Sequence, residues 1–186
     1  MWLQAMIPAD VWPVLHACTT CATSCYNPAM TETLPPPTLE HVCDLAVTIA
    51  PPVEVGHTPA GLRRMIPITG GTVKGPRMNG KVLAGGADFQ LILGGGTQAH
   101  LDARYVIELD DGTRVFVQNT ALRVASLEDS QRIMRGEPVS PDAVYFRCQP
   151  KLEATSAQWA WLSESQFIGN GRRAPDGVYI SFYRVC

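Results

Sequence analysis

The sequence lacks basic residues throughout its first third, because no lysine or arginine precedes Arg63 in a chain of 186 residues. A secretory signal needs a positively charged start, and an organelle transit peptide needs arginines. Long apolar runs are also missing, and none approaches the ~20 residues that cross a bilayer as a helix. We therefore expect a cytoplasmic protein that has no membrane partner.

Charge of either sign is sparse, at 17% of residues, and the net charge is -2. The lysines and arginines are scattered along the chain, whereas nucleic-acid binding calls for a basic face or stripe. We expect a small-molecule ligand as the partner and no nucleic acid. The sequence leaves the formation of a homo-oligomer open.

The common catalytic motifs are absent as well. The chain contains no H-E-x-x-H, no G-x-S-x-G, no P-loop and no dinucleotide-binding glycine motif. The triple glycine at 94–96 lies between strand-forming segments, so we interpret it as a hairpin and not as a phosphate loop. His57 and His100 stand alone. The sequence therefore predicts no cofactor and no metal.

Three cysteines near the N-terminus raise the one metal hypothesis. Cys18, Cys21 and Cys25 follow a C-x-x-C-x-x-x-C spacing, and His16 or His41 is a candidate fourth ligand. A structural zinc site of this type usually has a second close pair of ligands, which the chain lacks. We favour the interpretation that these cysteines lie outside the fold and hold no metal.

Residues 1–37 differ from the rest of the chain. They show neither a strand nor a helix period, and they end in the prolines Pro35 to Pro37, which favour an extended linker. We expect residues 1–37 to be a disordered extension, with Met30 a candidate for the natural start. Residues 38–186 are expected to form a single domain, a length that suits one sizeable core.

The remaining sequence is typical of short β-strands separated by turns. Glycines are dense within the strand-forming run 66–90, where they mark bends and bulges that let a sheet close into a barrel. One short helix is predicted near 126–135, capped by Ser126 and ended by Gly136. The pattern predicts an all-β protein, a closed antiparallel β-barrel of about eight or nine strands. The predicted strands are 39–49, 63–73, 80–84, 88–93, 98–109, 113–119, 144–154, 166–169 and 178–185.

Polar residues on several predicted strands share parity. Asp88 and Gln90 lie on one face of their strand, Asp102 and Arg104 on one face of the next, and Arg147 lies on a third strand. If these faces line the barrel interior, their side chains converge on one cavity. The alternative places Asp102 and Arg104 outside, because the odd positions 101 to 109 are all apolar and suit a core.

The segments that carry this pattern resemble an uncharacterised, mainly bacterial family, domain of unknown function 3237. The resemblance spans roughly residues 39–186 and includes Gly85-Gly-Ala-Asp-Phe-Gln90 and Leu101-Asp-Ala-Arg-Tyr105. It implies a closed barrel of the calycin or allene-oxide-cyclase type with a shared site at these two motifs. No activity is attached to the family as a whole.

We therefore expect a small-molecule-binding barrel, with cofactor-independent isomerase, cyclase or lyase chemistry on a small organic acid or aromatic metabolite. The alternatives are a non-catalytic carrier and a packed structural barrel. The expected catalytic residues are Asp88 as the base and Arg104 as the anion anchor. The expected ligand-binding residues are Gln90, Asp102, Tyr105, Asn119, Arg147 and Trp161.

Overall fold

The protein is described by a computed structural model that covers residues 33–175 and 177–186. The predictions made for Cys18, Cys21, Cys25 and Met30 therefore lie outside the described residues. The barrel comprises Pro37–Cys186. Its strands are β1 (Leu39–Ile49), β2 (Val53–Thr58), β3 (Gly61–Lys74), β4 (Gly80–Val82), β5 (Ala87–Leu93), β6 (Gln98–Leu109), β7 (Arg114–Ala125), β8 (Val144–Ala154), β9 (Phe167–Ala174) and β10 (Gly177–Val185). The helical elements are α1 (Leu127–Met134) and the 3₁₀ turns η2 (Gly94–Gly96), η3 (Pro141–Ala143) and η4 (Ala157–Leu162).

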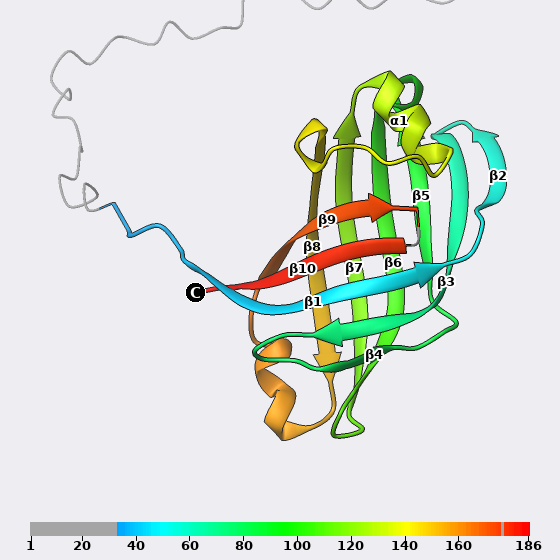
Figure 1. Cartoon of the computed structure of the whole chain (residues 1–186). Coiled ribbons are helices and arrows are strands. Elements are labelled where there is room, and N and C mark those ends of the chain that lie inside the picture. Colours follow the sequence, from blue (N-terminus) through cyan, green and yellow to red (C-terminus); the bar gives the residue numbers. More distant parts are fainter. Residues whose placement is uncertain (1–32, 176) are drawn as a thin grey trace, which may run out of the picture. The chain divides into compact units, whose positions relative to one another are not determined.

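The strands close into an antiparallel barrel, as the sequence predicts (Figure 1). The ring runs β1, β10, β9, β8, β7, β6, β5 and β3, and β3 closes it by pairing with β1. Two strands are additional to this ring. β4 continues the line of β5 between β3 and β6, and β2 pairs with β3 alone.

The inward face follows the period-two alternation of the strands. On β6 the odd positions face inward, and they end at Ile107 and Leu109 in the apolar core. On β7 the inward positions run from Val115 and Val117 to Ala125. The inner face is therefore apolar at one end of these two strands, while polar residues interrupt it toward the other end.

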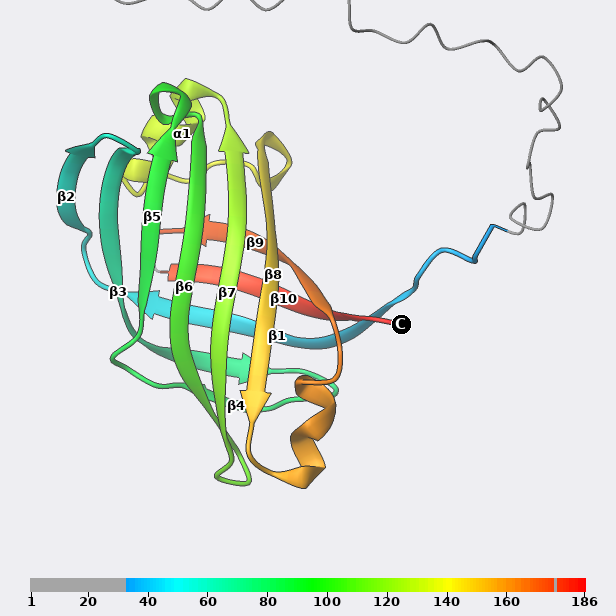
Figure 2. The same ribbon diagram turned by 180° about the vertical axis from the view of Figure 1, so that it is seen from behind.

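The two ends of the barrel carry different elements (Figure 2). α1 lies at one end, and the 3₁₀ turn η4 lies at the other. Trp161 and Leu162 of η4 pack against the apolar core, and the Trp161 ring lies tilted against that of Phe167 at 5.9 Å between ring centroids. The η4 end is therefore closed by apolar packing, which leaves the α1 end for an opening.

The helix has the predicted cap. The Ser126 hydroxyl accepts a hydrogen bond from the Asp129 amide at 3.0 Å, and Gly136 adopts the left-handed conformation just beyond the helix. Ile133 is buried, whereas Met134 is exposed at the barrel end. The sequence prediction also omitted β2 and ended β7 too early, at Asn119 in place of Ala125.

Candidate functional site

A cavity of about 350 Å³ opens at the α1 end of the barrel. Its walls are apolar over much of their area, and polar side chains from β3, β5, β6, β7 and β9 face into it. A small side chain leaves space for the cavity at its centre. Ala103 pairs with Asp88 on one neighbouring strand and with Asn119 on the other, so only a methyl group lies between these two polar side chains. The polar lining residues are Arg64, Asp88, Gln90, Tyr105, Asn119, Arg123, Arg135 and Arg173.

A hydrogen-bonded row crosses β3 and β5 on the cavity wall. Arg64 Nε donates to Gln90 Oε1 at 2.8 Å, and Gln90 Nε2 donates to Asp88 Oδ2 at 2.5 Å. Strand pairing sets this row, because Arg64 lies opposite Gln90 and Asp88 is two residues farther along the same face of β5. The row fixes the orientation of the Asp88 carboxylate.

Three buried oxygen atoms on this wall have no hydrogen-bond partner among the described residues. They are Asp88 Oδ1, Tyr105 Oη and Asn119 Oδ1, and all three residues line the cavity. A buried polar group without a partner costs about 1–3 kcal/mol, so such groups are uncommon in folded proteins. Their convergence on one cavity marks it as a site that a polar ligand completes.

Arg123 is the most informative cation of the site. It is 6% exposed and lines the cavity, and its guanidinium makes no hydrogen bond to another side chain or backbone group of the described residues. Burial lowers the pKa of Arg123 to about 10; the charges of Arg64 and Arg173 add to this shift, and the charge of Asp88 opposes it. The side chain is therefore cationic at neutral pH and lies in a pocket with an excess of positive charge.

Asp88 and Tyr105 are tuned in a way that suits proton chemistry. Burial raises the pKa of Asp88, although the Gln90 hydrogen bond and the charges of Arg123 and Arg64 oppose the shift. Burial also raises the pKa of Tyr105 well above its usual value, so its hydroxyl stays protonated and can donate. General acid–base catalysis uses such groups: a carboxyl group whose pKa is raised, and a hydroxyl group that stays protonated and can donate.

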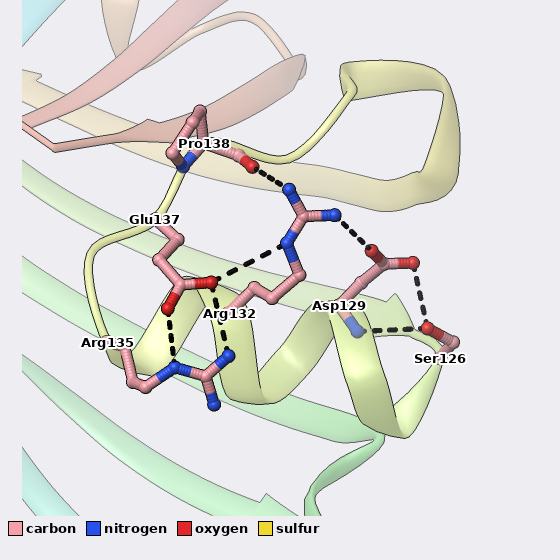
Figure 3. A network of polar contacts seen from close by, with 6 residues as sticks. All are labelled: Ser126, Asp129, Arg132, Arg135, Glu137 and Pro138. Carbon is pink, nitrogen blue, oxygen red and sulfur yellow. Dashed lines mark hydrogen bonds and ion pairs between the residues drawn. The ribbon is translucent and has the colours of Figure 1, made fainter.

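The mouth of the cavity is formed by α1 and the residues after it, together with prolines from the ends of β1 and β9. Figure 3 shows the ion pairs that hold this segment. Arg135 binds Glu137 through two hydrogen bonds of 2.6 and 3.1 Å, and Arg132 donates to the Pro138 carbonyl at 2.8 Å. Arg135 is therefore already neutralised by Glu137, in contrast to Arg123.

The structure brings together four of the residues predicted from the sequence. Asp88, Gln90, Tyr105 and Asn119 all face the cavity, from three adjacent strands. Their chemical roles stay predictions, but their convergence follows directly from strand parity and register.

The other four predicted site residues lie elsewhere, so placing them in the interior was wrong. Asp102 and Arg104 pair with each other on the outer face of β6 at 3.0 Å, with the Arg104 side chain 55% exposed. Arg147 is exposed on β8, where its guanidinium covers the ring of Tyr145. Trp161 packs at the closed η4 end. On β6 the apolar odd positions face the interior, so the alternative interpretation given for Asp102 and Arg104 is correct.

Sequence reasoning missed the four arginines of the cavity: Arg64, Arg123, Arg173 and, at the mouth, Arg135. A signal was present for Arg123, which shares parity with Asn119 four residues earlier on β7. Arg64 likewise shares parity with buried Ile66 and Ile68 on β3. Ending β7 at Asn119 concealed the first of these relationships.

Fold and site together define a small antiparallel β-barrel with a polar, one-ended cavity. The chain belongs to the family described as "Protein of unknown function (DUF3237)", whose model matches residues 37–185. It is 40% identical over 151 residues to a UPF0311 protein of Rhodopseudomonas palustris, an alignment that covers 80% of this chain and 98% of that protein.

Two solved structures share the fold. A conserved protein of unknown function from Rhodopseudomonas palustris superimposes with a TM-score of 0.77 at 36% identity, covering 83% of this chain and all of the other. A more distant structure, described as an enzyme from Penicillium herquei, has a TM-score of 0.62 at 19% identity and covers 83% of this chain and 98% of that one. The distant likeness concerns the fold alone. Among residues 33–175 and 177–186, no helix is long and apolar enough to cross a membrane.

Proposed function

We propose that this barrel binds a small organic anion in its cavity and transfers a proton on it without a cofactor. The observation that carries the proposal is the convergence on one cavity of the Arg123 guanidinium, which has no hydrogen-bond partner among the described residues, and the unpaired oxygens of Asp88, Tyr105 and Asn119. Burying a cation is costly, and the single charge of Asp88 offsets only part of the positive charge of Arg123, Arg64 and Arg173. An anionic ligand supplies the missing negative charge. The setting is a cytoplasmic one.

The chemistry divides among the residues by their protonation. Arg123 holds the ligand carboxylate, and Asp88 Oδ1, kept in place by Gln90, accepts a proton from the carbon beside a carbonyl group. Tyr105, which stays protonated, donates to the oxygen on which negative charge develops. This division supports isomerisation or cyclisation, in which Asp88 takes a proton from one atom of the substrate and returns it to another. It also supports elimination, in which Asp88 takes the proton and passes it to the departing group.

A packed structural barrel is disfavoured by the cavity, whose volume lies at the lower end of the ≈300–1,000 Å³ typical of small-molecule sites. The Penicillium herquei neighbour is called an enzyme, which is consistent with chemistry on this fold. The alternative is a non-catalytic carrier, which binds its ligand in the same cavity and in which Asp88 transfers no proton.

The test uses phenylpyruvate, a carboxylic acid with exchangeable protons beside its ketone. Incubated in D₂O with the protein, its C3 protons should exchange faster than without protein, as followed by proton NMR. Asp88→Asn should lose at least about tenfold of the excess rate, since general acid–base groups contribute ~10²–10⁴-fold. Asp102→Asn, which removes a carboxylate on the outer face, is the matched control and should leave the rate unchanged.

Two results argue against the proposal in different ways. Binding of phenylpyruvate by wild-type protein and Asp88→Asn alike, with no protein-dependent exchange, favours the carrier. Absence of binding by phenylpyruvate and by simple aliphatic and aromatic acids overturns the site itself.

A further inference from the structure

The cavity has a direction, which follows from strand register. Along β7, the inward positions from the closed end to the mouth are Val117, Asn119, Ala121 and Arg123. Tyr105 on β6 pairs with Val117 on β7. Asp88 on β5 pairs with Ala103 on β6, which in turn pairs with Asn119 on β7. Along the strands, Tyr105 is therefore attached farthest from the mouth, Asp88 is intermediate, and Arg123 is nearest the mouth.

The levels are well separated along the strand. Six residues divide Arg123 from Val117, and at ~3.3 Å per residue this is about 20 Å of strand. The long arginine side chain spans part of it, because Arg123 and Asp88 lie close enough for each charge to shift the pKa of the other. Beyond Tyr105 the barrel is filled by apolar side chains such as Ile107 and Leu152.

The charges follow the same direction. Two further arginines of the cavity, Arg64 and Arg173, lower the pKa of Arg123, so positive charge gathers on the mouth side. Arg64 is committed to Gln90, and Arg173 donates to the Gly177 carbonyl at 2.7 Å. Between the two ends, apolar side chains form most of the wall around Asp88, Gln90 and Asn119. These apolar residues include Ile66, Leu101, Phe146, Val178 and Ile180.

We infer that the ligand is a monocarboxylic acid with an apolar middle and an oxygen at its far end, bound with the carboxylate at Arg123 and the oxygen at Tyr105. This inference rests on the proposed function and adds the class and orientation of the ligand. A carboxylate at the inner end meets the Tyr105 hydroxyl but no cation there, which makes the opposite orientation unfavourable. The molecule enters with its uncharged oxygen first, past Met134 and Gly136 at the mouth.

Three small molecules of one skeleton test the two ends separately. The first, 3-(4-hydroxyphenyl)propionate, carries both groups; 3-phenylpropionate lacks the oxygen, and the methyl ester of the first lacks the charge. Calorimetric titration of the wild-type chain should rank the first molecule tightest. The ester should bind about tenfold weaker or more, and the molecule without the oxygen several-fold weaker, since hydrogen bonds to charged groups contribute more than neutral ones.

Variants then assign each preference to one end. Arg123→Met should abolish the preference for acid over ester and keep the preference for the phenol. Tyr105→Phe should do the reverse. Arg104→Met and Tyr145→Phe, both on exposed outer positions, are the matched controls and should retain both preferences. Arg123→Lys preserves the charge and should retain part of the preference for the acid.

The outcomes separate this inference from the proposed function. If Tyr105→Phe removes the preference for the acid, or if either variant removes both or neither, the orientation is wrong although the cavity still binds. If the wild-type chain ranks the three molecules equally, the ligand class is wrong, and this comparison needs no variant to fold. If none of the three binds while phenylpyruvate does, the inference fails alone. If no acid binds, both fail.

Discussion

The Gln90 amide donates a hydrogen bond to one carboxylate oxygen of Asp88, while the other oxygen is buried without a partner in the described chain. One oxygen is thereby fixed, and the second is left for a ligand. Gln90 also accepts from Arg64, so the pair is anchored to the neighbouring strand. Such support keeps a reactive group in a single orientation before substrate arrives.

Gln90→Met should remove both hydrogen bonds at nearly constant volume. Arg64 and Asp88 would each lose a buried partner, and we expect a loss of roughly 2–4 kcal/mol in the free energy of unfolding. The pKa of Asp88 should rise further, because the Gln90 hydrogen bond lowers it. Urea denaturation checks the stability, with exposed Gln98→Met as the control. Equal midpoints for the two variants would show that the row contributes nothing.

Asp88 also predicts how stability depends on pH. Its pKa is raised in the folded state, so the fold binds the proton more tightly than the unfolded chain does. The stabilisation from the protonated carboxyl is complete below the unfolded pKa near 3.8, and it is lost as the pH rises through the folded value. At neutral pH the ionised carboxylate therefore destabilises the fold.

Asp88→Asn removes this titration. The melting temperature of the variant relative to wild type should increase from pH 4 toward pH 7, so that the variant gains most at neutral pH. Thermal unfolding of both proteins in matched buffers measures the difference. A difference that shrinks over this range would mean that the neighbouring arginines outweigh burial and lower the pKa of Asp88.

The barrel itself could be predicted from the sequence because each strand carries its own signal. The limits of β1, β6 and β8 follow from alternation and from the turn residues beside them, and the Ser126 cap marks α1. β2 could not be predicted in the same way, because its valines Val53 and Val55 are exposed and it pairs with β3 alone. Its formation depends on the neighbouring strand more than on its own pattern.

The site could be predicted only in part. Parity within β5 placed Asp88 and Gln90 together, and parity within β6 placed Tyr105 inside while it also excluded Arg104. Arg123 was missed because the strand was expected to end at Asn119, four residues before it, whereas β7 continues to Ala125. Only the register between strands reveals that such charges meet in one cavity.

The glycine pair at 85–86 was expected to mark a bend, and its two members have different roles. Gly85 adopts a positive φ of 105° with open space where a Cβ would lie. At Gly86 a Cβ would come within 2.5 Å of Tyr105 Cβ and 2.6 Å of the Arg104 carbonyl oxygen. Gly86 therefore lets β6 pass close by and keeps Tyr105 in place.

Gly86→Ala should destabilise the fold by about 2–3 kcal/mol, as overpacking commonly does. Gly85→Ala, the adjacent control, should cost only about 1–2 kcal/mol, from backbone strain. Chemical denaturation of both variants gives the comparison. If Gly85→Ala is the more damaging change, close packing at Gly86 is not what the turn requires.

The central claim, that Arg123 anchors an anion inside the barrel, is tested most directly by calorimetric titration of phenylpyruvate into three proteins. These are the wild-type chain, Arg123→Met and Arg104→Met, the last removing an arginine from the outer face. Losing a charged hydrogen-bond partner should weaken binding about 10- to 100-fold in Arg123→Met, while Arg104→Met should bind like wild type. Equal affinity in all three proteins, with Arg123→Met folded by circular dichroism, would contradict the account.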